Sequence, residues 1–173
     1  MHLFWSDERA VPPEHPDSNF KMAMEAGFSQ VGIPLSHIHR MVAEQDIETN
    51  AALYESFLRP HLHGKGFDLV LLGMGEDGHT ASLFPNTDAL HIKDRWVAAN
   101  YIPQKNTWRM TLTFPCINAS RHIAIYVLGE SKQDMLKQIF TSKNPVLPIE
   151  FVGTAEHKAV WIADQKAAAL LPI

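Results

Sequence analysis

The chain has 173 residues, a formal net charge of −4 and a pI near 6.2. This length suits one domain with a sizeable core, so residues 1–173 are expected to form a single domain. The charge excludes the basic surface typical of proteins that bind nucleic acid or anionic membranes, and no apolar run approaches the roughly 20 residues of a membrane span. A single cysteine, Cys116, excludes an internal disulfide, and no signal peptide opens the chain, so we expect a cytoplasmic protein.

The first 44 residues predict a strand, a loop, a helix and a second short strand. Residues 3–6 have strand character, whereas three prolines indicate a loop over residues 7–16. Ser18 is placed to cap a helix whose apolar stripe continues to Val31. Residues 35–44 predict a short strand and a loop.

The rest of the chain alternates between helix and strand. Strands are expected at residues 67–72, 96–101, 109–114, 123–128 and 159–163, and helices from residue 46, over 132–140 and over 165–171. Ser131 and Asp134 have the spacing of a capping box before the second of these helices. The alternation predicts an α/β, three-layer sandwich with a mostly parallel, Rossmann-like open sheet.

The strand at residues 67–72 and the loop after it form the most informative segment. Its continuous apolar run predicts a strand buried on both faces, as in a parallel sheet. Three glycines follow, which are Gly73, Gly75 and Gly78. Among them lie three ionisable residues, which are Glu76, Asp77 and His79. Open α/β sheets bind ligands at the carboxyl ends of their strands, so this loop predicts a proton-transfer site.

Two other interpretations of the glycine loop have to be weighed. The G-x-G-x-x-G spacing is found in dinucleotide-binding folds, but Pro85 shortens any following helix and the two acidic residues would repel a pyrophosphate. The alternative of a tight turn with a solvated acid pair remains open from the loop alone.

Two motifs resemble those of the 6-phosphogluconolactonases. Residues 73–85, GMGEDGHTASLFP, are similar to the signature loop of that family, and residues 5–12, WSDERAVP, followed by Ser18 and Asn19, are similar to its other motif. The related glucosamine-6-phosphate deaminases differ after the shared Asp-Gly-His. Weaker similarity extends through residues 109–113, 129–132 and 161–171.

The resemblance implies hydrolysis of 6-phospho-D-glucono-1,5-lactone to 6-phosphogluconate, the second step of the oxidative pentose phosphate pathway. His79 is then the base that activates water, because its side chain titrates near neutral pH. Asp77 is spaced to orient the imidazole, and Arg9 is expected at the active site. Chemistry of this kind requires no metal and no organic cofactor.

The phosphorylated substrate is expected to meet cationic and backbone groups. Arg9, Arg109 and Lys132 are the candidate phosphate ligands. For Arg109 the alternative of a solvated strand-edge charge remains open. The amides of Gly75 to Gly78, or the Arg9 guanidinium, are candidate donors to the oxyanion. Asp7 belongs to the same motif as Arg9 and is expected at the substrate.

Other features predict structure and assembly. His37 with His39, and His61 with His63, have the spacing of zinc pairs, but neither pair has a third ligand, so solvent exposure is expected.

The family normally carries an N-terminal segment with a glycine-rich Ser/Thr loop, which this sequence lacks, so the chain is expected to self-associate and to bind 6-phosphogluconate weakly. The alternatives are a non-catalytic sugar-phosphate-binding module and a deaminase or isomerase of amino-sugar phosphates.

Overall fold

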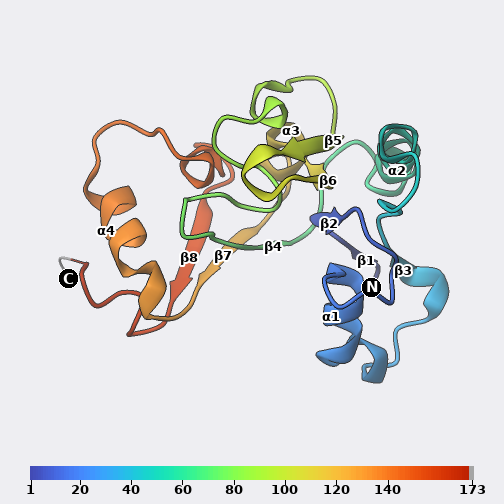
Figure 1. Ribbon diagram of the computed structural model, residues 1–173, viewed down its shortest axis with the longest axis horizontal. Helices are drawn as coiled ribbons and strands as arrows, with labels where there is room; N and C mark the ends of the chain where they lie inside the picture. Colours follow the sequence, from blue (N-terminus) through green and yellow to red (C-terminus); the bar gives the residue numbers. More distant parts are fainter. Residues whose placement is uncertain (172–173) are drawn as a thin grey trace.

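The computed structural model describes residues 1–171 of the chain (Figure 1). The strands are β1 (Leu3–Phe4), β2 (Asp7–Arg9), β3 (Ile38–His39), β4 (Val70–Gly73), β5 (Val97–Ile102), β6 (Thr107–Leu112), β7 (Ile123–Val127) and β8 (Ala159–Ala163). The α-helices are α1 (Asn19–Glu25), α2 (Ile47–His61), α3 (Phe114–Asn118) and α4 (Gln133–Thr141). Short 3-10 turns connect several of them.

The strands form three separate sheets, two of them parallel and one antiparallel. β4, β7 and β8 are parallel in the order β4-β7-β8, and β1 pairs with β3, also in parallel. β2, β6 and β5 form an antiparallel unit in the order β2-β6-β5. Figure 1 shows α4 beside β8 at one end of the molecule, and α1 and α2 at the other. The predicted α/β class with parallel strands is confirmed, and the antiparallel unit is an addition to it.

The core lies on one side of the β4-β7-β8 sheet and extends under β6 and α2. It is formed by fully buried aliphatic side chains, which include Leu58, Met110, Leu112, Ile117, Ile123, Ile125, Leu136 and Ile149. Cys116 lies in this core, where burial raises the pKa of its thiol to about 12. This cysteine is therefore a packing residue.

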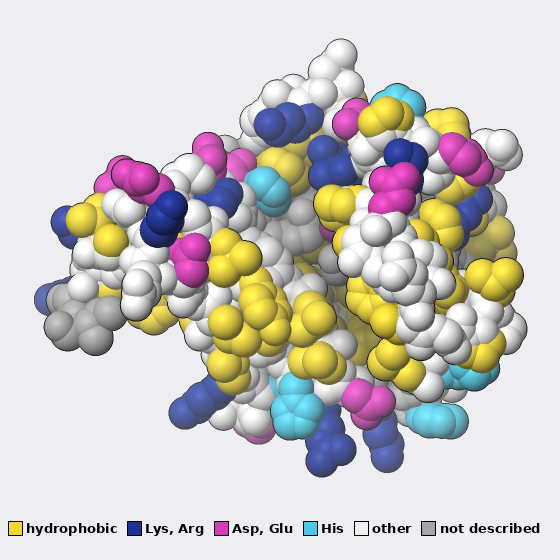
Figure 2. Space-filling model, turned by 90° about the horizontal axis from the view of Figure 1, so that it is seen from below, with side chains coloured by type: hydrophobic (Ala, Val, Ile, Leu, Met, Phe, Trp, Pro, Cys, Tyr) yellow, Lys and Arg dark blue, Asp and Glu magenta, His cyan; other side chains and the backbone are white. Residues whose placement is uncertain are grey.

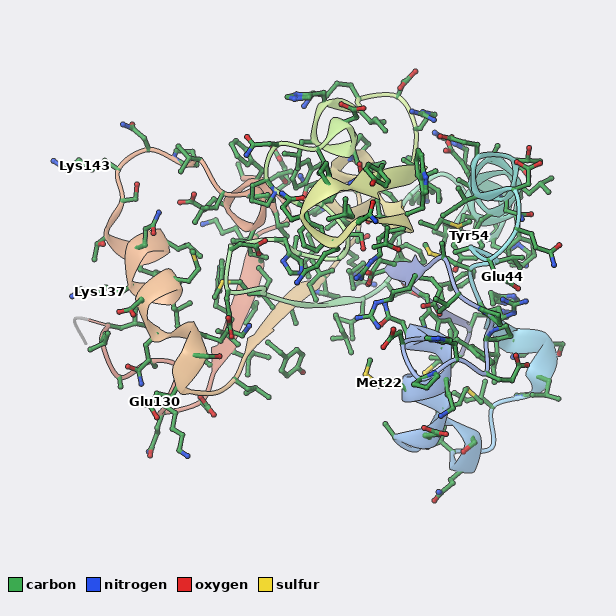
Figure 3. The ribbon with its side chains drawn as sticks, viewed as in Figure 1. Met22, Glu44, Tyr54, Glu130, Lys137 and Lys143 are labelled. Atoms are coloured by element: carbon green, nitrogen blue, oxygen red, sulfur yellow. The ribbon has the colours of Figure 1, made fainter. Side chains whose placement is uncertain are left out.

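Tyr54 connects α2 to the beginning of the chain. Figure 3 shows it on the inner side of α2, and its hydroxyl donates to the carbonyl of His39 at 2.9 Å and accepts from the amide of Trp5 at 3.2 Å. Burial raises the pKa of this hydroxyl well above its ordinary value. Tyr54 thereby helps to position β1 against β3, because these two strands are joined by only two pairs of residues.

The structure corrects several predicted boundaries near the amino terminus. The predicted loop 7–16 begins with β2, because Asp7, Glu8 and Arg9 pair with β6. Ser18 caps α1 as predicted, but the helix ends at Glu25. Residues beyond it form a short 3-10 turn, so the apolar stripe that reaches Val31 does not belong to one helix.

Predictions in the second half are also corrected. Phe114 begins helix α3 and does not continue β6, since Pro115 occupies a first-turn position that a helix tolerates. Neither Ser131 nor Asp134 forms a capping box, because Lys132 is the N-cap of α4 and makes no side-chain capping bond. Residues 165–171 form successive turns where a helix was predicted.

Four histidines gather where β1, β3 and α2 meet, and these are His2, His37, His39 and His61. His61 and His63 are exposed, as predicted, whereas His37 and His39 are half-buried, contrary to the prediction. Nδ1 of His2 lies 2.9 Å from Nε2 of His39, and the His2 ring stacks on His37 with centroids 4.0 Å apart. His61 lies 5.6 Å from His39 between ring centroids. Desolvation and then the neighbouring imidazoles lower the pKa of both His2 and His39.

The lowered pKa of His2 and His39 predicts a fold that is sensitive to acid. A histidine whose pKa is lower in the folded state binds protons more readily when unfolded, so stability is full above about pH 6.5 and falls as the pH drops below it. We expect the thermal midpoint of the wild type to fall between about pH 7.5 and 5.5, and to fall less in His39→Gln. Thermal melts monitored by circular dichroism across this range measure the difference.

His122→Gln is the matched control, because His122 is exposed and lies outside the cluster. It should keep the wild-type dependence on pH. Equal slopes in His39→Gln and the wild type would show that the clustered imidazoles do not set the acid sensitivity.

Within residues 1–171, no helix has both the length and the apolar character needed to cross a membrane.

Candidate active site

The loop after β4 closes on itself through backbone hydrogen bonds. The amide of Gly75 donates to the carbonyl of His79 at 2.8 Å, and the amide of Gly78 donates to the carbonyl of Gly75 at 3.2 Å. The carbonyl of Gly78 accepts from the amide of Ile149 at 3.0 Å, which anchors the loop to the core. His79 is therefore presented from a rigid turn.

The geometry of the loop requires glycine at positions 75 and 78. A Cβ at Gly75 would lie 2.1 Å from Nδ1 of His79 and 2.7 Å from Oδ1 of Asp77. Gly78 has a φ of +75° and packs on Leu147. Because their amides already donate within the loop, Gly75 and Gly78 shape the site, and the amides of Glu76 and Asp77 stay candidate oxyanion donors beside the guanidinium groups.

The predicted partnership of Asp77 and His79 is present. Oδ1 of Asp77 lies 2.5 Å from Nδ1 of His79 and accepts from the His79 amide at 3.2 Å. Burial alone would raise the pKa of Asp77, but the hydrogen bonds from His79 and the charge of its imidazole hold that pKa below the ordinary value. A carboxylate on Nδ1 keeps the proton there and leaves the lone pair on Nε2, which is the arrangement of a general base.

Phe84 joins the histidine loop to the arginines. Its ring stacks on His79 with centroids 3.8 Å apart at an interplanar angle of 15°. The guanidinium carbon of Arg109 lies 6.0 Å from the centroid of the same ring. Phe84 is itself buried, so it fixes the plane of the imidazole and its position relative to the cation.

Asp7 connects three parts of the site. Its Oδ2 accepts from the hydroxyl of Ser82 at 2.7 Å, its Oδ1 accepts from the side-chain amide of Asn19 at 3.2 Å, and Arg109 lies 3.9 Å away. Ser82 lies three residues after His79 in the sequence, so this carboxylate holds β2 against the catalytic loop. These contacts give Asp7 a positioning role in addition to the substrate contact expected of it.

The buried carboxylate of Glu8 anchors β2 to the beginning of α1. It is 2% exposed, and its two oxygens accept from the amides of Arg9, Asn19 and Phe20 and from the hydroxyl of Ser18. Two of these amides belong to the first turn of α1, where a negative charge is favoured by the helix dipole. Ser18 is thus a capping residue, as predicted, and Asn19 braces β2 against α1.

Arg9 and Arg109 form a pair of like charges. They are directly opposed in the register of β2 and β6, so their side chains leave the same face. Desolvation and then the charge of Arg9 lower the pKa of Arg109, while Asp7 opposes the shift. Within residues 1–171, the Nε atoms of both arginines are buried without a hydrogen-bond partner. An anion bound between the two guanidinium groups would remove this repulsion.

Lys132 lies apart from the other candidates. It ends the 3-10 turn Glu130–Lys132 that follows β7, and β7 is the neighbour of β4 in the parallel sheet. The carboxyl ends of parallel strands share one edge, so Lys132 lies along the same edge as the His79 loop. No hydrogen bond or ion pair connects it to the other candidates within residues 1–171.

Sequence reasoning missed three residues of the site, which are Glu8, Ser82 and Phe84. Ser82 and Phe84 fall within the motif at residues 73–85, which was the available signal. Their partners Asp7 and Arg109 are too distant in the sequence for spacing to indicate the contacts. Among the described residues, no group of three or more His, Cys, Asp or Glu side chains is arranged to hold a metal ion.

Comparison with known proteins identifies relatives across nearly the whole chain. The profile of the family described as "Glucosamine-6-phosphate isomerases/6-phosphogluconolactonase" matches residues 1–161. A 6-phosphogluconolactonase of Chlamydia pneumoniae is 40% identical over 170 residues, which cover 96% of this chain and 65% of that protein. A 6-phosphogluconolactonase of Synechocystis is 42% identical over 175 residues, which cover 96% of this chain and 72% of that protein.

A solved structure shares the fold. The crystal structure of 6-phosphogluconolactonase from Thermotoga maritima has a TM-score of 0.80 and 34% identity, covering 94% of this chain and 72% of that one. The chain thus spans only part of its relatives, 65% of the length of the Chlamydia pneumoniae protein. The matching profile and the identity establish that this chain belongs to the family of glucosamine-6-phosphate isomerases and 6-phosphogluconolactonases.

Proposed function

We propose that this chain hydrolyses 6-phospho-D-glucono-1,5-lactone to 6-phosphogluconate. The observation that carries the proposal is the His79 imidazole, which has Asp77 on Nδ1, a free Nε2 and a pair of arginines beyond Phe84. A general base next to two guanidinium groups can activate a water molecule for attack on the carbonyl of a negatively charged ester. The names of the relatives support the same substrate.

In this mechanism His79 acts twice. Nε2 removes a proton from water as the oxygen adds to the lactone carbonyl, and the imidazolium formed is stabilised by Asp77. The tetrahedral intermediate places a negative charge on the former carbonyl oxygen, which a guanidinium group stabilises. When the carbon–oxygen bond of the ring breaks, His79 returns the proton to the departing ring oxygen, and the free carboxylic acid forms.

The phosphate would be held by cations at the same edge of the sheet. Arg9 and Arg109 offer guanidinium groups that suit bidentate contact with a phosphate or carboxylate. Lys132, at the end of β7, would supply a further point charge. This arrangement places the substrate across the carboxyl ends of β4 and β7, where open α/β sheets bind ligands.

Lactonase activity is tested directly on fresh 6-phosphoglucono-1,5-lactone. The purified chain should release acid faster than buffer alone, and His79→Ala should remove most of this excess over the buffer rate. Ammonia release from glucosamine-6-phosphate would favour a deaminase. Binding of 6-phosphogluconate without turnover would favour a non-catalytic sugar-phosphate-binding module.

Removing either arginine should weaken product binding. We expect Arg9→Met and Arg109→Met each to raise the Kd for 6-phosphogluconate by roughly 10–100-fold, as loss of a charged hydrogen bond implies. Isothermal titration calorimetry measures this change. The thermal midpoint should hold or rise, because each substitution removes one of two like charges that face each other.

Arg121→Met provides the matched control for the arginine pair. Arg121 is exposed and precedes β7, at the opposite edge of the sheet from the His79 loop. Its substitution should leave the Kd unchanged. An unchanged Kd in both Arg9→Met and Arg109→Met would show that the phosphate binds elsewhere.

A further inference from the structure

The neighbouring strands β7 and β8 end level with one another. Val127 of β7 lies beside Ala163 of β8 in the register of the sheet, and the amide of Asp164 donates to the carbonyl of Val127 at 3.2 Å. β7 leads into the turn that carries Lys132, whereas β8 leads directly to Asp164. Figure 1 shows both strands ending near the beginning of α4. Asp164 therefore lies next to the turn of Lys132, although the two residues are far apart in the sequence.

The Asp164 carboxylate holds the residue that begins this turn. Its two oxygens both lie within hydrogen-bond distance of the Gly129 amide, Oδ1 at 3.1 Å and Oδ2 at 3.2 Å. Oδ1 also accepts from the amide of Ala167 at 2.7 Å. The hydrogen bonds from Ala167 and then from Gly129 hold the pKa of Asp164 below its ordinary value. The charged carboxylate thus joins the turn after β7 to the residues after β8.

Gly129 has a backbone conformation that other residues rarely adopt. Its φ is +91° and its ψ is 158°, in a region that is essentially restricted to glycine. Its carbonyl accepts from the amide of Lys132 at 3.2 Å, which closes the turn Glu130–Lys132. Asp164 binds the amide of Gly129, and Lys132 binds its carbonyl. The position of the Lys132 backbone therefore depends on the Asp164 carboxylate.

The placement of Lys132 matters because a lysine acts on a phosphate as a flexible point charge. Its side chain is half-buried, and within residues 1–171 it forms no ion pair with an acidic side chain. Figure 2 views the molecule from below Figure 1 and shows acidic and basic side chains interspersed at the left end, where α4 lies. Positive charge is not concentrated there, so the contribution of one ammonium group depends on where the backbone holds it.

We propose that Asp164 is a positioning residue of the substrate site, which holds the turn at Gly129 so that Lys132 meets the phosphate of the substrate. This inference rests on the proposed function, because it takes the phosphate to bind across the ends of β4 and β7. Asp164 does not touch the substrate, since its negative charge would repel a phosphate. It acts through the backbone of Gly129.

The sign of the change in affinity separates positioning from direct electrostatics. Removing a negative charge near the phosphate would by itself tighten binding. If Asp164 positions Lys132, Asp164→Ala should instead raise the Kd for 6-phosphogluconate by roughly 3–10-fold, measured by isothermal titration calorimetry. The KM for the lactone should rise by a similar factor, whereas kcat should stay within about twofold because the contact between His79 and Asp77 is untouched. A Kd that is unchanged or lower would overturn the proposal.

Two variants control for the loss of charge. Asp164→Asn retains an oxygen that can accept from the Gly129 amide, so its Kd should stay within about twofold of the wild type. Asp134→Ala removes the same charge two residues after Lys132, from an exposed position in the first turn of α4, and should not raise the Kd. Equal increases in Asp134→Ala and Asp164→Ala would contradict the positioning role.

A double-mutant cycle shows whether the effect passes through Lys132. Lys132→Met should raise the Kd by roughly tenfold, and Asp164→Ala should add nothing in that background. An equal effect of Asp164→Ala in both backgrounds, or an unchanged Kd in Lys132→Met, would overturn the inference while turnover by the wild type keeps the proposed function intact. A wild type that neither binds 6-phosphogluconate nor hydrolyses the lactone would refute the proposed function itself, and this inference with it.

Gly129→Ala tests the same turn if Asp164→Ala does not fold. Alanine is strained at a φ of +91°, but a Cβ there meets no atom within 4 Å, so the substitution acts on the backbone of the turn alone. The Kd should rise about threefold or more. Gly64→Ala is the matched control, because Gly64 has a φ of +68° and equally free surroundings but follows α2. Equal Kd values in Gly129→Ala, Gly64→Ala and the wild type would show that this turn does not position a phosphate ligand.

Discussion

Replacing His79 with alanine should lower the turnover of 6-phosphoglucono-1,5-lactone by roughly 10²–10⁴-fold, the contribution of a positioned general base. The physical reason is loss of the Nε2 lone pair that accepts the proton of the attacking water. His79 contributes little to the core, since its imidazole stacks on Phe84 and is partly exposed. The thermal midpoint should therefore change little. Initial rates of acid release, corrected for spontaneous hydrolysis, measure the effect.

Two further variants decide whether His79 acts as a base or only packs on Phe84. Asp77→Asn lets an amide donate to Nδ1 and moves the imidazole proton to Nε2, so the rate should fall by about tenfold or more while the fold is retained. His91→Ala removes an exposed histidine from a 3-10 turn and should leave the rate unchanged. Turnover within a few-fold of wild type in His79→Ala would refute the assignment.

Adding one methyl group at Gly75 should reduce activity nearly as much as removing His79. A Cβ there would lie 2.1 Å from Nδ1 of His79, so the imidazole or the loop has to move. Either movement breaks the hydrogen bond with Asp77 that keeps the lone pair on Nε2. We expect Gly75→Ala to lower turnover by roughly 100-fold or more, as displacement of a catalytic base implies.

Gly73→Ala provides an unusually close control for Gly75→Ala. Gly73 lies two residues earlier, and a Cβ at that position meets no atom within 4 Å. The same methyl group should therefore leave turnover and the thermal midpoint unchanged. If Gly73→Ala and Gly75→Ala lose activity equally, the loop is sensitive to any substitution and the steric argument fails.

Local patterns in the sequence predicted the contact between Asp77 and His79 well. The apolar run before Gly73 and the ionisable residues after it predicted a loop at a strand end, and the structure places Asp77 and His79 in direct contact there. This succeeds because both residues belong to one short turn. The same locality explains why the N-caps at Ser18 and Asp46 were predicted correctly.

Contacts between distant segments were not predictable in the same way. Nothing in the spacing of Asp7 indicated that it would accept from Ser82, or that β2 would pair with β6. Three prolines after β2 favoured a loop from residue 7 onward, but residues 7–9 pair with β6 and therefore form a strand. The burial predicted for both faces of β4 was wrong, since Leu69 and Leu71 are exposed. An apolar run shows that both faces of a strand are hydrophobic, but it does not show whether another element covers each face.

The pairing of β2 with β6 has a consequence for how the protein is made. Asp7 of β2 lies opposite Thr111 of β6, so β2 can pair only after a strand much later in the sequence has been synthesised. Contacts of such high sequence separation form late in folding, because the intervening chain has to be ordered first. The His79 loop can close locally, whereas the opposed arginines cannot meet until β6 has emerged. A nascent chain that stops before Thr107 would thus carry Asp77, His79 and Arg9 but lack Arg109, the second of the two arginines proposed to bind the phosphate.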